Sequence, residues 1–103
     1  MTSAEADAVV REKIVAAGYG DLFTVRAAYG IGIGSPPGWG ENSVVNIRPG
    51  DPRVLEPGMC FHIVPALYKA DLGAVCCSMP IHITADGVEQ LTAIEPELFV
   101  LDP

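Results

Sequence analysis

Residues 29–41 read YGIGIGSPPGWGE, and the interpretation of this glycine-rich stretch decides the fold. Its alternating glycines superficially suggest a loop that binds a nucleotide phosphate. A dinucleotide-binding loop needs a helix directly after its glycines, because the helix N-terminus meets the pyrophosphate. Pro36, Pro37 and Gly38 follow instead and exclude that helix. The stretch is therefore not a phosphate loop, and its glycines instead let the backbone pass close to a ligand or a packed strand.

The composition describes a small, apolar chain. It has 103 residues, of which half are hydrophobic and only 18% are charged. A chain of this length makes one domain and buries only about two-thirds of the surface that its unfolded form exposes. Ordinary domains carry about a quarter charged residues. We therefore expect that another chain covers part of the apolar surface, either in a homo-oligomer or as a companion subunit.

The charge and the cysteines restrict the partners and the compartment. Six basic and thirteen acidic residues give a net charge of −7, which disfavours nucleic acid and anionic membranes. No apolar run is long enough to span a bilayer, and the N-terminal residues lack the pattern of a secretion signal. Cys60, Cys76 and Cys77 form a poor disulfide framework. Reduced thiols and a cytoplasmic location are the expectation.

The N-terminal residues predict a helix over residues 4–17. Thr2 and Glu5 have the spacing of a capping box, in which each side chain bonds to the backbone of the other residue. Gly18 follows at the position where a helix favours a left-handed residue. Residues three or four apart form the expected apolar face, namely Ala6, Val10, Ile14 and Ala17.

The rest of the chain predicts short antiparallel strands, and the order of elements therefore indicates an α+β fold. Pro80 is expected to interrupt the strand in which it lies. The strand-like segments are FTVRAAYGIG at 23–32, SVVNI at 43–47, MCFHIVPALY at 59–68, AVCCSMPIHIT at 74–84, VEQLTAI at 88–94 and ELFVLD at 97–102.

Histidines and cysteines give no metal motif. His62 and His82 both fall in predicted strands, and their spacing to the cysteines matches no standard zinc signature. A structural histidine at the sheet surface is the favoured interpretation of each. Cys76 and Cys77 are expected to be small buried hydrophobic residues rather than nucleophiles.

Three ordered stretches carry a family resemblance: YGIGIGSPPGWGE, VLEPGMCF at 54–61 and ITADGVEQLT at 83–92. Together they resemble the C-terminal half of the pita-bread hydrolases, which include creatinase, aminopeptidase P, prolidase and methionine aminopeptidase. The resemblance implies half of a pita-bread fold, with an N-terminal helix followed by a mainly antiparallel sheet. Residues 1–103 would form a single domain similar to the C-terminal half of a creatinase or aminopeptidase catalytic domain.

Within that group the chain looks most like the ectoine hydrolase branch, which is often labelled Xaa-Pro peptidase-like. The carrying residues are AGYGDLF at 17–23, YGIG with Tyr in place of His, PPGWGE at 36–41 and F-H-x-x-P at 61–65. The resemblance implies a metal-free hydrolase that opens a cyclic amidine-type ring. Such an enzyme contrasts with the relatives that cleave an Xaa-Pro bond with two metal ions.

The departures from the family pattern concern the metal ligands. The metallopeptidases of this family use two Asp from the first half of the fold, with one His and two Glu from the second. The resemblance places Tyr29, Val64 and Ser78 at the latter three positions. A phenol, an isopropyl group and a small hydroxyl are poor replacements for imidazole and carboxylates as ligands. We therefore expect neither a dinuclear metal site nor another cofactor.

The resemblance also supplies a candidate pocket. It places Tyr29, Trp39 and Tyr68 as substrate-binding residues around His62, which would act as general acid or base near neutral pH. The structural alternative is that His62 satisfies a neighbouring backbone group. Three functions remain open: a metal-free hydrolase acting on a cyclic amidine or Xaa-Pro-type substrate, a non-catalytic binding or regulatory pseudoenzyme, and a truncated inactive fragment.

Overall fold

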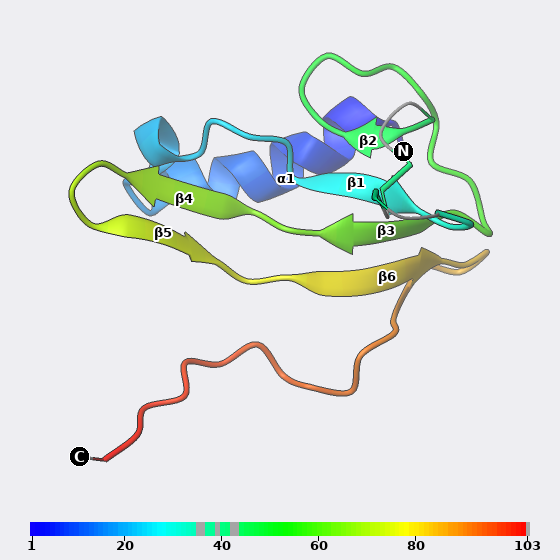
Figure 1. The fold of residues 1–103 in the computed structure, drawn as a ribbon. Helices are drawn as coiled ribbons and strands as arrows, with labels where there is room; N and C mark the ends of the chain where they lie inside the picture. Colours follow the sequence, from blue (N-terminus) through cyan, green and yellow to red (C-terminus); the bar gives the residue numbers. More distant parts are fainter. Residues whose placement is uncertain (35–36, 39, 42–43, 103) are drawn as a thin grey trace.

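The computed structural model describes residues 1–34, 37–38, 40–41 and 44–102, so the predicted pocket residue Trp39 lies outside the described residues. One helix precedes seven short strands in the described chain (Figure 1). The elements are α1 (Ser3–Ala16), the 3-10 turn η1 (Gly20–Leu22), β1 (Ala28–Ile31), β2 (Asn46–Ile47), β3 (Cys60–Ile63), β4 (Ala66–Lys69), β5 (Gly73–Cys76), β6 (Met79–Ile83) and β7 (Val88–Gln90). No helix in these described ranges is long and apolar enough to cross a membrane.

The start and the end of α1 follow the predicted capping signals. The Thr2 hydroxyl accepts the Glu5 backbone N–H at 3.2 Å, and the Glu5 carboxylate accepts the Thr2 backbone N–H at 2.7 Å. The latter bond lowers the pKa of the Glu5 carboxyl, because it favours the ionised form. At the other end Gly18 adopts a φ of 85°, the left-handed conformation expected after a helix. The capping box is confirmed, and the helix lies one residue earlier than predicted.

The inner face of α1 packs on the sheet. Ala6, Val10 and Ile14 contact the core as predicted, whereas Ala17 is exposed. Ala17 is the C-cap residue, where the chain leaves the helix, so the helical periodicity no longer directs its side chain inward. The core cluster lies between the helix and the sheet and comprises Phe23, Ala27, Ala28, Val45, Ile47, Phe61 and Ile81.

The strands form a five-stranded antiparallel sheet in the order β2-β1-β3-β6-β7, with β4 and β5 as a separate two-stranded sheet. The predicted α+β class with a mainly antiparallel sheet is confirmed. The single segment predicted at 59–68 divides between β3 and β4, so the chain leaves the main sheet there. In Figure 1 the β4–β5 hairpin extends beyond the end of the main sheet.

Three local predictions are wrong. Pro80 does not interrupt its strand but lies inside β6, opposite His62. Cys76 and Cys77 are exposed rather than buried, because among the described strands β5 pairs only with β4 and all four residues of β5 are exposed. Residues 97–102 form no strand and are exposed, since no neighbouring strand edge pairs with them.

Candidate functional site

A tyrosine and a histidine form a close pair on the sheet face that α1 does not cover. Tyr29 of β1 and His62 of β3 are directly opposed in the antiparallel register. The Tyr29 hydroxyl lies 2.5 Å from Nδ1 of His62, a short hydrogen bond. The two rings meet edge to face, with centroids 5.0 Å apart and an interplanar angle of 88°. Both residues are half-buried, so water screens the pair only partly.

The sheet fixes this geometry through the neighbouring buried residues. Ala28 and Phe61 flank the pair in sequence and are 1% and 0% exposed. Because successive strand residues point to opposite faces, burying Ala28 and Phe61 under the helix directs Tyr29 and His62 to the other face. Core packing therefore sets the position of the pair.

The hydrogen bond permits two proton arrangements of His62. If Nδ1 carries the proton, it donates to the phenol oxygen and leaves Nε2 with a free lone pair, as in a general base. If Nε2 carries the proton, the Tyr29 hydroxyl donates to Nδ1 and Nε2–H is available as a hydrogen-bond donor. In both arrangements Tyr29 fixes the orientation of the ring, which is the function of the third member of a catalytic triad.

Arg26 adds a positive charge beside the pair. Its guanidinium carbon lies 5.2 Å from the centroid of the Tyr29 ring, within the range of a cation–π contact. Motif reasoning missed Arg26, although it lies three residues before Tyr29. Arg26 lies before β1, so strand periodicity from Tyr29 does not place its side chain.

The structure brings only some of the predicted site residues together. Tyr29 and His62 meet, whereas Tyr68 lies on β4, where it pairs with Ala74 and is 52% exposed. No contact joins Tyr68 to the pair in the described part of the chain. The departure of the chain from the main sheet after β3 separates them.

The glycine-rich stretch after Tyr29 forms a close backbone approach, as its glycines predicted. The Glu41 backbone N–H donates to the Gly30 carbonyl at 2.7 Å. A Cβ atom added at Gly32 would lie only 2.5 Å from Oε1 of Glu41. A side chain at position 32 would therefore displace the flexible Glu41 carboxylate.

The residues that the resemblance places at the metal-ligand positions do not fit a dication. The phenol oxygen of Tyr29 is engaged by His62, and the side chain of Val64 has no donor atom. Ser78 is exposed in the link between β5 and β6. Within the described ranges, no group of three or more His, Cys, Asp or Glu side chains is arranged to hold a metal ion. Hard dications need several oxygen ligands and borderline ones nitrogen or sulfur donors, which this set does not supply.

A second histidine pair lies toward the edge of the same sheet. Nδ1 of His82 is 3.3 Å from Oε2 of Glu89, which lies directly opposite it on β7. The Glu89 side chain is 62% exposed. Sequence reasoning treated His82 as structural and missed this contact, although the turn at Asp86 and Gly87 places the two residues across a hairpin.

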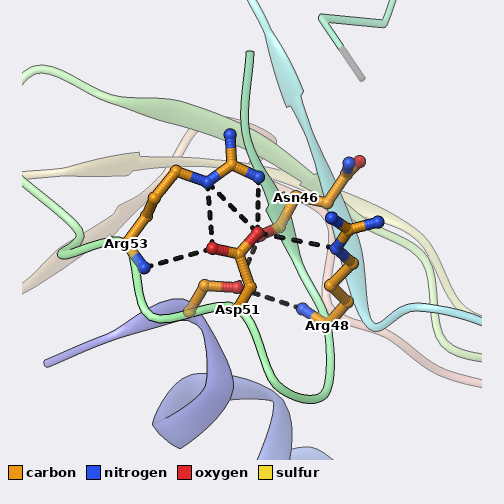
Figure 2. Close-up of polar contacts among 5 residues, drawn as sticks. Asn46, Arg48, Asp51 and Arg53 are labelled. Atoms are coloured by element: carbon orange, nitrogen blue, oxygen red, sulfur yellow. Dashed lines mark hydrogen bonds and ion pairs between the residues drawn. The ribbon is translucent and has the colours of Figure 1, made fainter. Parts of the chain in front are cut away.

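A buried carboxylate ties the loop before β3 to the start of α1 (Figure 2). Asp51 is 4% exposed and accepts hydrogen bonds from the backbone and guanidinium of Arg53. These bonds hold the pKa of the Asp51 carboxyl well below its ordinary value and raise the pKa of Arg53. The Asp51 carbonyl also accepts the Ala4 backbone N–H at 2.9 Å. Asp51 therefore has a structural function, which the flanking arginines in RPGDPR could have signalled.

Comparisons with known proteins identify the family of the chain. Residues 1–88 match metallopeptidase family M24. The chain is 44% identical to the ectoine hydrolase of Halomonas elongata over 73% of its own length and 18% of that protein. It is 37% identical to an Xaa-Pro dipeptidase of Lactobacillus delbrueckii subsp. lactis, over 98% of this chain and 26% of the relative.

The fold is similar to that of a solved prolidase. The structure of the prolidase from Pyrococcus furiosus superposes with a TM-score of 0.76 at 35% identity. The match covers 92% of this chain and 26% of the prolidase. The chain thus spans about a quarter or less of the length of the relatives that it matches.

Proposed function

The chain belongs to metallopeptidase family M24, and we propose that it supplies the C-terminal part of a hydrolase site that works through Tyr29 and His62 without a metal ion. The proposed substrate is a cyclic amidine or an Xaa-Pro-type compound. Relatives named ectoine hydrolase and Xaa-Pro dipeptidase support this substrate class. The relatives are about four times longer or more, so the other wall of the site would come from a companion chain or from further polypeptide.

The observation that carries the proposal is the 2.5 Å contact between the Tyr29 hydroxyl and Nδ1 of His62. The resemblance assigns a metal-binding histidine to position 29. A phenol at that position cannot replace an imidazole as a ligand for a borderline metal, but it can orient a neighbouring histidine. The replacement and the hydrogen bond together favour acid–base chemistry over metal chemistry.

The chemistry of such a site follows from the free Nε2 of His62. Nε2 accepts a proton from water as the water oxygen adds to the carbon of the C=N or amide C=O group. The imidazolium then returns this proton to the departing nitrogen as the C–N bond breaks. Tyr29 accepts from Nδ1–H throughout and stabilises the positive charge on the ring.

A non-catalytic binding module is the second candidate function. The observation that favours it is the separation of Tyr68 from the Tyr29–His62 pair, which leaves one predicted wall of the pocket away from the other. A domain of this kind would retain the fold and bind a small molecule without hydrolysing it.

The test is hydrolysis of ectoine and of an Xaa-Pro dipeptide by the protein that carries this chain. We expect His62→Asn to lower kcat by about 100-fold or more, as loss of general acid–base catalysis does. His82→Asn is the matched control, because it removes an imidazole from the same sheet face, and we expect its kcat to stay near that of the wild type.

Two outcomes would contradict the proposal. One is hydrolysis that His62→Asn leaves unchanged. The other is a wild-type protein that hydrolyses neither substrate but is stabilised by one of them in a thermal-shift assay, which would support the binding module.

A further inference from the structure

A pocket rich in arginine lies at the β2 edge of the sheet, next to the Tyr29–His62 pair. It has a volume of about 460 Å³ and lies between α1, the segment before β1 and the residues after β2. Its polar lining includes side chains from all three segments. We call it the arginine pocket, and the residues relevant to binding are Arg11, Thr24, Arg26, Asn46 and Arg48.

The charge of this pocket is opposite to that of the whole chain. The sequence has thirteen acidic and only six basic residues. Arg11, Arg26 and Arg48 are three of those six, and no Asp or Glu is among the described residues that line the pocket. A concave site that gathers cations on an acidic protein attracts anions locally, although the net charge repels them at a distance.

Arg11 forms a rigid wall of the pocket. Its Nε and Nη2 atoms donate to the two carboxylate oxygens of Asp7 at 2.7 and 3.1 Å. The same guanidinium donates to the backbone carbonyls of Phe23 and Val25 at 2.9 and 3.1 Å. Since four of its five N–H donors are occupied and its charge is paired with Asp7, Arg11 shapes the pocket and holds the segment that carries Arg26.

Arg26 and Arg48 keep donors available for a ligand. Arg26 contacts the face of the Tyr29 ring, and within the described ranges no carboxylate lies at ion-pair distance from it. Nε of Arg48 is 3.5 Å from Asp51, a carboxylate that Arg53 already holds with shorter bonds. The Arg48 side chain is 55% exposed, so solvent or a ligand reaches its guanidinium.

We propose that the arginine pocket binds a small oxyanion, a carboxylate or phosphate group, between the guanidinium groups of Arg26 and Arg48. Planar guanidinium forks match the paired oxygens of these groups and form strong, charge-assisted hydrogen bonds with them. The bound anion would lie near Tyr29, because the guanidinium of Arg26 that would bind it lies over the Tyr29 ring. This inference does not depend on the proposed hydrolase activity, since it concerns binding alone.

The experiment is a ¹H–¹⁵N NMR titration of the 103-residue chain with sodium acetate and, separately, with inorganic phosphate at constant ionic strength. We expect saturable shifts of the backbone amides in residues 24–26 and 46–48 with at least one anion. The anion that binds more tightly identifies the preferred group. Arg26→Gln should weaken binding about tenfold, as loss of a charge-assisted hydrogen bond does.

Lys69→Gln is the matched control, because it makes the same charge change on β4, outside the pocket lining. We expect it to leave the dissociation constant unchanged. Arg48→Gln is the second variant, in case Arg26→Gln disturbs the fold, and should weaken binding similarly. The proposal fails if neither anion gives saturable shifts in the millimolar range, or if Lys69→Gln weakens binding as much as the arginine variants do.

Discussion

The two ends of this sheet differ in how fully they are covered. At one end β1, β2 and β3 lie under α1, and their inward side chains, such as Phe61 and Ile47, are buried. At the other end all three residues of β7 are exposed. The short Tyr29–His62 bond lies at the covered end, and the longer His82–Glu89 contact lies toward the exposed end.

The difference shows how packing creates a site. Both histidines lie next to core residues, Phe61 and Ile81, and each faces a polar partner on the same sheet. Only His62, whose partner strand β1 also has buried residues, has a short, half-buried contact. Where core packing already holds the backbone fixed, a polar contact forms with a smaller loss of conformational entropy. The covered end is therefore where a site that needs precise geometry is expected.

The largest expected difference between the two ends is in the stability lost when a hydrophobic side chain is replaced by alanine. Phe61→Ala should lower the free energy of unfolding by about 3–5 kcal/mol, because it leaves a cavity at a fully buried position. Val88→Ala on β7 should change it by about 0.5 kcal/mol or less, since Val88 is 63% exposed. Urea unfolding followed by circular dichroism measures both. Equal effects would show that the two ends are packed alike.

The next prediction concerns the buried carboxylate at the covered end. Because bonds to Arg53 lower the pKa of Asp51 below its unfolded value of 3.8, its contribution to stability is present above that pH and is lost as the pH falls below it. Asp51→Asn should lower the melting temperature at pH 7. It should also make the melting temperature fall less as the pH is lowered. The measurement is the melting temperature between about pH 3 and pH 7, a range that includes the ordinary pKa of a carboxyl group.

Asp102→Asn provides the control for this titration, because it removes a carboxyl from the exposed tail. Its melting curve should follow that of the wild type at every pH. An Asp51→Asn protein with unchanged acid sensitivity would show that the ion pairs in Figure 2 do not stabilise the fold.

A smaller effect is expected at the helix start. Thr2→Ala removes the hydroxyl that caps the Glu5 backbone N–H and should cost about 1 kcal/mol. Thr2→Ser keeps the cap and should restore most of that loss. Urea unfolding distinguishes them, and a Thr2→Ala protein as stable as the wild type would contradict a capping function.

The two histidine pairs give the smallest expected effects and the sharpest comparison between the ends. Tyr29→Phe should cost about 1 kcal/mol, because it removes the bonded hydroxyl from a half-buried site. Glu89→Gln should cost about 0.5 kcal/mol or less, since exposed ion pairs contribute little. Unfolding titrations at pH 7 test the order, and a reversed order would contradict the packing argument.

Local features of this fold were predictable from the sequence, whereas the pairing of its strands was not. Thr2, Glu5 and Gly18 specify the ends of α1 through contacts within a few residues. The exposure of Cys76 depends instead on whether β5 finds a second neighbour, which no local pattern encodes. The separation of Tyr68 from His62 has the same cause, because both lie in one continuous apolar run that the fold divides.

The candidate site was predictable only where a motif or a register fixed it. The resemblance selected Tyr29 and His62, and the antiparallel register of β1 and β3 brings them into contact. Arg26 was missed because no motif signals its contact with the Tyr29 ring. Asp51 and the His82–Glu89 contact were missed although local signals existed, namely the arginines on either side of Asp51 and the turn at Asp86 and Gly87.

The most direct test of the central claim is a calorimetric titration of the chain with Mn²⁺ and Co²⁺ at neutral pH. The account predicts no saturable binding, because the resemblance places a phenol, an isopropyl group and an exposed hydroxyl at the metal-ligand positions. Stoichiometric binding of either ion that Tyr29→Phe or His62→Asn abolishes would contradict it.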